Sequence, residues 1–127
     1  MQRGRRRGRG PDRTRHHVVD RLYAVHLLEH VPDMLALLEE CHRVLRPDGI
    51  LHVLCPDRRH VNAYADPTHV RYLDVQTIKY VCVPHPGVSC WWPRHVASDG
   101  ATVFADLTPV DPGGEPATPQ RLARFFD

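Results

Sequence analysis

The sequence predicts one small α/β domain, and three observations support that prediction. A short apolar pattern at residues 20–24 is typical of a strand, and it precedes the clearest helical pattern of the chain, at residues 34–45. An Arg-Pro-Asp-Gly turn at 46–49 then leads into an apolar run at 50–54. Strand, helix, turn and buried strand in this order are typical of a β-α-β unit with two parallel strands. A chain of 127 residues has room for one such core.

The helix over residues 34–45 is predicted from its periodicity. Its apolar residues recur at i, i+3, i+4 and i+7, which places them on one face. They are Met34, Leu37, Leu38, Cys41, Val44 and Leu45. Pro32 and Asp33 stand just before the helix, where a proline and a carboxylate favour its start. The strand over 50–54 shows little alternation, so we expect both of its faces to be covered.

The second half of the chain contains weaker patterns. Residues 55–73 are polar and predict an irregular loop, and residues 75–81 predict a short helix. Residues 88–97 and 101–107 flank Ser-Asp-Gly at 98–100. Because Asp-Gly is a strong turn signal between two strands, these segments predict a C-terminal β-hairpin.

Charge and composition divide the chain into three parts. Residues 1–16 hold seven arginines and one acid, and predict a disordered basic Arg/Gly tail. Residues 17–108 form the predicted domain, and residues 109–127 form a Pro/Gly-rich C-terminal segment in which 122–126 docks as a last helical turn. The body is mildly acidic, so the net charge of +2 does not by itself indicate nucleic-acid binding.

Cysteine usage and hydropathy predict a location. The four cysteines show no C-x-x-C spacing, and we expect reduced thiols in a cytoplasmic protein. No apolar stretch approaches the roughly 20 residues of a membrane span, so no membrane partner is expected.

Four segments point together to one family. Residues 20–33 (DRLYAVHLLEHVPD) contain a strand and an L-E-H-V-x-D segment, and residues 40–49 (ECHRVLRPDG) contain an E-x-x-R-V-L-R-P-x-G helix end and turn. A strand follows at 50–54, and residues 66–72 (DPTHVRY) contain a D-P-T-H-x-R-Y loop. In this order and spacing, residues 18–81 resemble the C-terminal half of a class I S-adenosylmethionine-dependent methyltransferase domain of the type 11 kind. The resemblance implies a partial Rossmann-like sheet made of the family's strands four to seven.

The chain departs from the family in its cofactor motif. Family members carry a glycine-rich turn after their first strand, because glycines let the backbone approach the cofactor. Gly8 and Gly10 have part of that spacing, but no apolar strand precedes them and a proline follows. Asp48 also stands where a glycine is usual in the family. We therefore expect a methyltransferase that binds S-adenosylmethionine weakly or not at all as this chain alone.

The Arg/Gly tail has two interpretations. The chain has sixteen arginines and one lysine, which suggests a GC-rich gene. Shifted reading frames of such genes tend to encode Arg, Gly and Pro. The tail can therefore be a truncation or frameshift product that stands in place of strands one to three. Alternatively it contacts RNA, as arginine-rich segments do. We also expect that a partner chain could supply the missing strands and complete the sheet.

The resemblance implies specific ligand contacts. Ligands of open α/β sheets bind outside the carboxyl ends of the strands. This places Ala24, Val25 and His26 beside the methionine part of S-adenosylmethionine, although Ala24 and Val25 can equally be core residues. The implied acceptor is a small molecule or a glycan hydroxyl.

The loop at 66–72 holds the predicted substrate residues. Asp66 and Arg71 are predicted to contact substrate, and His69 is predicted to remove a proton from a substrate hydroxyl, since its side chain titrates near neutral pH. Alternatively Asp66 and Thr68 form a turn that satisfies its own backbone amides.

No metal is predicted, but one set of residues keeps that alternative open. If residues 26–30 are helical, His26 and His30 share a face, and with Glu29 and His69 they could bind one ion. A histidine-rich set disfavours Mg²⁺, which prefers oxygen ligands. The same five residues match the H-x-x-E-H pattern of zinc proteases, which gives a metal-dependent hydrolase as a further alternative. If no metal binds, Glu29 and His30 are expected to stabilise residues 26–33 by hydrogen bonds.

Overall fold

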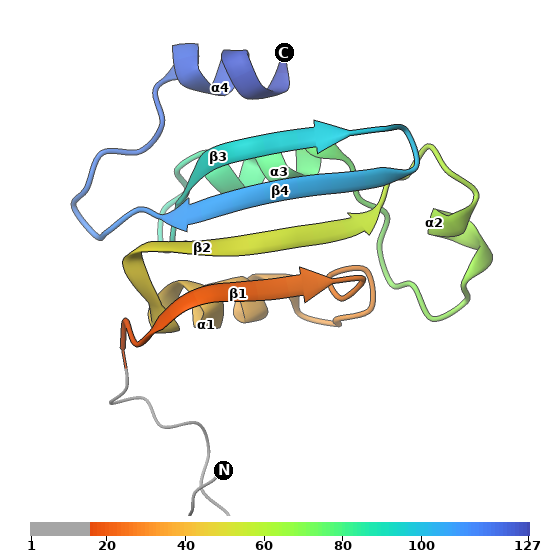
Figure 1. The fold of residues 1–127 in the computed structure, drawn as a ribbon, viewed down its shortest axis with the longest axis horizontal. Helices are drawn as coiled ribbons and strands as arrows, with labels where there is room; N and C mark the ends of the chain where they lie inside the picture. Colours follow the sequence, from red (N-terminus) through yellow and green to blue (C-terminus); the bar gives the residue numbers. More distant parts are fainter. Residues whose placement is uncertain (1–15) are drawn as a thin grey trace, which may run out of the picture.

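A computed structural model describes residues 16–127, so the predicted disordered tail lies, except for its last residue, outside the described residues. Eight elements follow in chain order (Figure 1). They are β1 (Val19–Val25), α1 (Met34–Val44), β2 (Leu45–Pro56), α2 (Asn62–Ala65), α3 (Val75–Cys82), β3 (Trp91–Ser98), β4 (Thr102–Pro109) and α4 (Pro119–Phe126).

The four strands form one mixed sheet in the order β1-β2-β4-β3. β1 and β2 are parallel and are connected through α1, whereas β4 runs antiparallel to both β2 and β3. The predicted β-α-β unit and hairpin are therefore confirmed. The hairpin turns at Gly100, whose φ of +90° favours glycine. The result is an α/β fold compatible with part of a Rossmann-like sheet.

Helix α1 begins where the sequence predicts it. Asp33 is the N-cap, and its carboxylate accepts a hydrogen bond of 3.0 Å from the amide of Ala36. The helix ends one residue early, because Leu45 is extended and is fully buried as the first residue of β2. His42 is also buried, and its Nε2 lies 3.1 Å and 3.0 Å from the carbonyl oxygens of Cys90 and Val110.

The turn after α1 loops out of the β1–β2 ladder. Val19 pairs with Leu45 and Arg21 pairs with Ile50, so the intervening residues of β2 form a bulge. A Cβ on Gly49 would lie 2.9 Å from the carbonyl oxygen of Asp20. Glycine is therefore required at this close approach of two backbones.

One face of the sheet is covered and the other is bare. Helices α1 and α3 both lie behind the sheet in Figure 1, and the face toward the viewer carries no helix among the described residues. Burial along β2 alternates accordingly: Leu51 and Val53 are buried, whereas His52 and Leu54 are only partly buried. The prediction that both faces of this strand are covered is therefore wrong.

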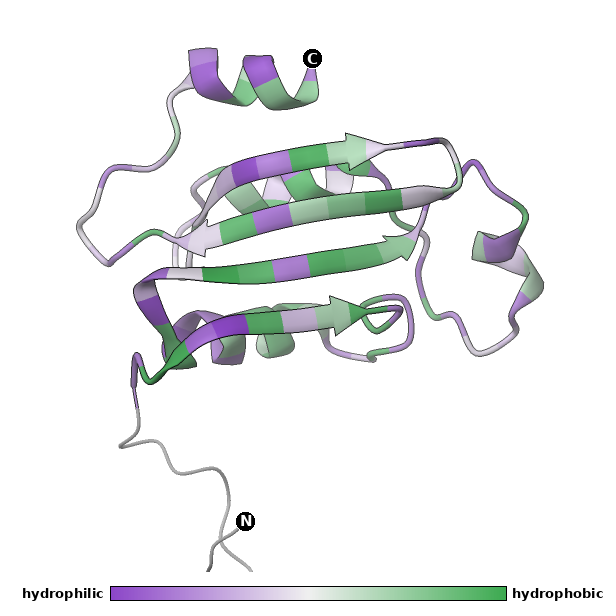
Figure 2. Cartoon of the chain, in the orientation of Figure 1, coloured by the Kyte–Doolittle hydropathy of each residue, from purple (hydrophilic) through white to green (hydrophobic). Residues whose placement is uncertain are grey.

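The bare face carries its own polar network. His52 on β2 pairs with Asp106 on β4, in strands that are otherwise mostly hydrophobic (Figure 2). The Nδ1 atom of His52 lies 2.6 Å from the carboxylate of Asp106, and Arg21 donates to Nε2 at 2.8 Å. The exposed ring of Tyr23 stacks on His52, and Phe104 also lines this shallow hollow of about 390 Å³.

The C-terminal part packs against the sheet. The predicted helix at 75–81 is confirmed as α3, with Asp74 and Thr77 forming a capping box. The predicted last turn is confirmed as α4, which begins earlier than predicted and contributes Leu122 and Phe126 to the core. The guanidinium of Arg121 lies 4.6 Å from the centre of the Trp92 ring.

Within residues 16–127, no helix has the length and apolar character that crossing a membrane requires.

Candidate functional site

The carboxyl end of β1 holds the predicted cofactor residues. Ala24 is buried in the core, whereas Val25 and His26 are exposed. The amide of His26 extends the ladder by donating to the carbonyl of Leu54 at 2.8 Å. The φ of His26 is +51°, which is unfavourable for a non-glycine residue and turns the chain sharply away from the sheet. Of the three predicted cofactor residues, Val25 and His26 therefore offer side-chain surface to a ligand and Ala24 does not.

Glu29 is the buried acid of this region. It is 2 % exposed, and its Oε1 atom has no hydrogen-bond partner among the described residues. Its Oε2 atom lies 3.8 Å from Nδ1 of His26 and 3.9 Å from Nε2 of His30, beyond hydrogen-bond distance. Burial, and after it the negative charge of Glu29, raises the pKa of the Cys55 thiol to about 12. Glu29 is thus a buried carboxylic acid side chain whose oxygens form no hydrogen bond of ordinary length with the described residues.

The loop that contains the D-P-T-H sequence packs directly on the turn that contains Glu29. The amide of Val70 donates to the carbonyl of Glu29 at 2.7 Å. The hydroxyl of Thr68 lies 3.0 Å from Nδ1 of His30, and the rings of His30 and His69 meet edge to face at 4.7 Å. Two segments that the sequence separates by almost 40 residues therefore form one site.

The same loop satisfies its own polar groups. The Oδ1 atom of Asp66 accepts hydrogen bonds from the backbone amide of Thr68 at 2.8 Å and from its hydroxyl at 2.6 Å. These hydrogen bonds from Thr68 lower the pKa of the Asp66 carboxyl. The self-bonded turn is thus confirmed, and substrate contact by Asp66 stays a prediction.

Arg71 braces the turn that holds Glu29. Its guanidinium donates to the carbonyl oxygens of Leu28 at 2.6 Å, of Val31, and of Pro32 at 3.0 Å. Three backbone acceptors therefore engage this side chain, and substrate contact by Arg71 also stays a prediction.

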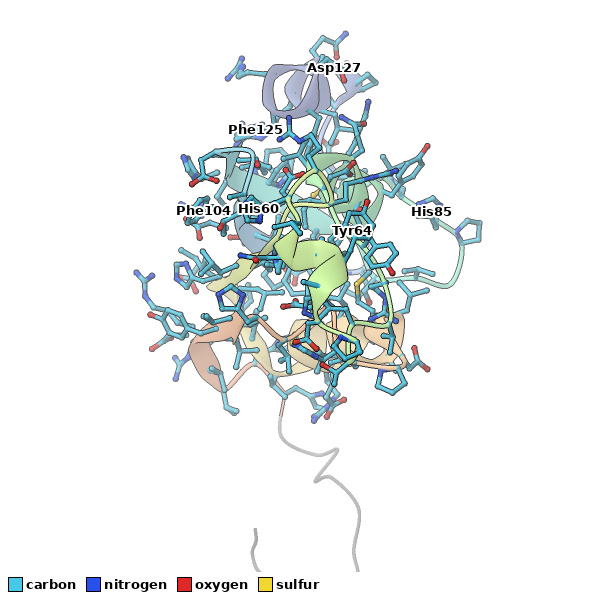
Figure 3. All side chains as sticks on the ribbon, turned by 90° about the vertical axis from the view of Figure 1, so that its right-hand side faces the viewer. His60, Tyr64, His85, Phe104, Phe125 and Asp127 are labelled. Carbon is cyan, nitrogen blue, oxygen red and sulfur yellow. The ribbon has the colours of Figure 1, made fainter. Side chains whose placement is uncertain are left out.

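His69 is held inside the loop rather than on its surface. Its side chain is 6 % exposed, and Nδ1 lies 2.8 Å from the carbonyl oxygen of Ala63 in α2. Its Nε2 atom lies 3.5 Å from Oδ2 of Asp66. Figure 3 shows the end of the sheet at which β1 and β2 terminate, with α2 and Tyr64 in front. The proposed general-base role of His69 stays a prediction.

The metal alternative needs a correction. Residues 28–30 form a turn, not a helix, so His26 and His30 do not share a helical face. The group whose ligand atoms come within 4.8 Å of one another is Glu29, His30 and His69, without His26. The residues of the H-x-x-E-H pattern lie after β1 and in this turn, and no comparison supports the hydrolase alternative.

A second buried acid went unrecognised in the sequence. Asp57 follows β2 and is fully buried; its carboxylate accepts from the backbone and guanidinium of Arg59 and, at 2.6 Å, from the hydroxyl of Ser98. The Arg59 hydrogen bonds hold the pKa of Asp57 well below its usual range. The sequence did contain a feature that could have identified this acid: Asp57 directly follows a buried strand and stands two residues before Arg59. This network ties the end of β2 to the hairpin.

Comparison with known proteins finds a family similarity over part of the chain. The family model for the methyltransferase domain matches residues 13–53, which include β1, α1 and most of β2. Residues 13–53 are therefore similar to part of a methyltransferase domain. No curated protein and no solved structure matches the chain significantly.

Proposed function

We propose that this chain is the C-terminal part of a methyltransferase that transfers a methyl group from S-adenosylmethionine to a small-molecule or glycan hydroxyl. The observation that carries the proposal is the family match at residues 13–53, because it falls on the β-α-β unit that the structure forms there. The four strands, in chain order, would be strands four to seven of the full sheet.

The reaction needs alignment more than chemical assistance. The acceptor oxygen forms a bond to the methyl carbon while the bond from that carbon to the sulfonium sulfur breaks, and the hydroxyl proton passes to a base or to water. Such displacement is favoured when the reactants are held in line and water is excluded. The side chains of Val25 and His26 are exposed at the carboxyl end of β1, which supports the proposal that they would form one wall beside the methionine part of the cofactor.

The fit to the cofactor is incomplete in this chain. Among residues 16–127, no strand leads into a glycine-rich turn whose amides could cradle the cofactor. We therefore propose that these 127 residues by themselves bind S-adenosylmethionine weakly or not at all.

Two surfaces are suited to a completing partner. Within residues 16–127, the sheet order leaves β1 with one unpaired edge, and no helix covers the face opposite α1 and α3. Tyr23 and Val25 are 65 % and 53 % exposed on β1, which is a large apolar exposure for strand residues. A further strand along β1 and helices over this face, from a partner chain or another segment, would bury both.

A chimera tests the proposed function. The N-terminal half of an established class I methyltransferase, with its glycine-rich turn, is joined before Val18, and S-adenosylmethionine binding is measured by calorimetry. The proposal predicts micromolar binding by the chimera. The matched control replaces the glycine-rich turn with alanines, which should abolish binding. A chimera that melts cooperatively but binds no cofactor would contradict the assignment.

We also propose a location for the protein from its cysteines. All four are unpaired thiols, and Cys55 and Cys82 are buried. This supports the proposal of a reducing, cytoplasmic environment.

A further inference from the structure

We propose that the pocket between α1 and α3 binds a small amine that carries an apolar ring or chain. The pocket has a volume of about 330 Å³, which is near the lower end of the range for small-molecule sites. Leu35 and Leu38 line it from α1, Tyr80 and Val81 line it from α3, and Trp91 lines it from β3. It shares no residue with the candidate functional site, so this proposal does not depend on the proposed methyl transfer.

The first argument is the apolar lining at the mouth and at the base. Leu35 is 54 % exposed and Tyr80 is 66 % exposed, whereas Trp91 is buried. Exposed apolar side chains around a concave surface are typical of a ligand site. A smaller void of about 10 Å³ adjoins the pocket, with Met34 and Leu38 in both linings. Because the Met34 side chain is flexible, an apolar group can extend toward this void.

The second argument is a single acid with a fixed position. Glu39 is the only acidic residue that lines the pocket. Its Oε1 atom accepts a hydrogen bond of 2.6 Å from the amide of Ser89, and its Oε2 atom accepts one of 2.8 Å from the Ser89 hydroxyl. A carboxylate offers about four acceptor positions, so two remain for a ligand. Among the described residues, no ion pair compensates the charge of Glu39.

The basic residue of the lining is engaged elsewhere. Nε2 of His85 lies 3.2 Å from the carbonyl oxygen of Tyr80, which can only accept, so this nitrogen donates there and not to Glu39. An ammonium group has three N–H donors for the free positions of the carboxylate. The Tyr80 ring at the mouth also favours a cation near its face. The charge therefore selects an amine and disfavours an acid of the same shape.

The experiment titrates three matched compounds into the full chain labelled with ¹⁵N. Phenylbutylamine, phenylbutanol and phenylbutyrate share the ring and the chain and differ in the head group. We expect saturable shifts of backbone amide signals in α1, in α3 and at residues 85–89. The amine should bind about fivefold more tightly than the alcohol, as a partly exposed ion pair allows, and the acid should bind most weakly. Added salt should reduce the advantage of the amine over the alcohol.

Two pairs of variants separate the charge from the apolar surface. Glu39→Gln should lower the affinity of the amine to that of the alcohol, whereas Glu115→Gln, on an exposed acid outside the pocket, should not. Leu35→Ala should weaken all three compounds by a similar factor of about three to five. The matched control is Leu27→Ala, on a residue that is 40 % exposed outside the pocket.

The comparison of the three compounds on the unaltered chain needs no variant, so a variant that fails to fold leaves the test intact. Absence of saturable shifts with millimolar phenylbutylamine would overturn the proposal. Equal affinity for the amine and the acid, or shifts that map outside α1, α3 and residues 85–89, would overturn it as well. An amine preference that folded Glu39→Gln retains, or that Glu115→Gln also removes, would exclude Glu39 as the recognising group.

Discussion

The guanidinium of Arg71 donates a 2.6 Å hydrogen bond to the carbonyl of Leu28, a residue 43 positions earlier in the chain. Further hydrogen bonds to Val31 and Pro32 make Arg71 the connection between the loop after β2 and the turn after β1. Both segments carry motifs that resemble those of methyltransferase domains, and this one side chain holds them in contact.

Replacing Arg71 should therefore destabilise the fold. Arg71→Met retains much of the aliphatic stem but leaves three carbonyl groups without their charged donor. We expect the free energy of unfolding to fall by about 2–3 kcal/mol, measured by urea denaturation. Arg94→Met is the matched control on an exposed arginine and should change stability little. Equal effects of the two replacements would contradict the bracing role of Arg71.

Asp57 should make stability depend on pH in the acid range. Hydrogen bonds from Arg59 and Ser98 depress its folded-state pKa, so its contribution is complete above the unfolded pKa of about 4 and is lost as the pH falls through the folded pKa. Asp57→Asn should lower the free energy of unfolding at pH 7 by about 2 kcal/mol. The difference from the wild type should shrink below about pH 4.

Denaturant titrations at several pH values measure that difference. Asp111→Asn, on an exposed side chain, is the control and should give no pH-dependent difference. A deficit of Asp57→Asn that stays constant down to pH 3 would argue against an ionised Asp57 in the folded protein.

Gly49 should not tolerate a side chain. A Cβ there would lie 2.9 Å and 3.0 Å from the carbonyl oxygens of Asp20 and Arg46, and both are backbone atoms that cannot move aside cheaply. Gly49→Ala should lower the free energy of unfolding by about 1–3 kcal/mol, measured by thermal denaturation. The neighbouring Asp48→Ala, on an exposed residue, should be nearly neutral. Unchanged stability of Gly49→Ala would contradict the close approach of β1 and this bulge.

The C-terminal helix should contribute to the stability of the whole domain. Leu122 is 9 % exposed and belongs to the core cluster, although it lies within the Pro/Gly-rich C-terminal segment at 109–127. Leu122→Ala should cost about 2–3 kcal/mol in a single cooperative unfolding transition. The exposed Arg124→Ala is the control. A transition unchanged by Leu122→Ala would show that α4 does not pack on the domain.

Local patterns predicted most of the elements. The apolar spacing gives the helix over 34–44, Asp33 marks its start, and the Asp-Gly pair at 99–100 gives the hairpin. These features depend on neighbours within a few residues, which the sequence displays directly. The parallel pairing of β1 with β2 also follows, because a short β-α-β connection permits little else.

Three features depended on contacts that the sequence does not display. The apolar run at 50–54 reads as a strand buried on both faces, but no helix among the described residues covers its second face. Residues 26–30 suggested helical spacing, whereas the positive φ of His26 starts a turn. That turn buries Glu29 and brings it to His69, across a separation that periodicity cannot detect.

The most direct test of the account is calorimetric titration of S-adenosylmethionine into the isolated 127-residue chain. Residues 13–53 are similar to a methyltransferase domain, yet no described strand leads into a glycine-rich turn that could hold the cofactor. The account predicts no saturable binding in the micromolar range by protein that melts cooperatively. A micromolar dissociation constant with one site per chain would contradict it.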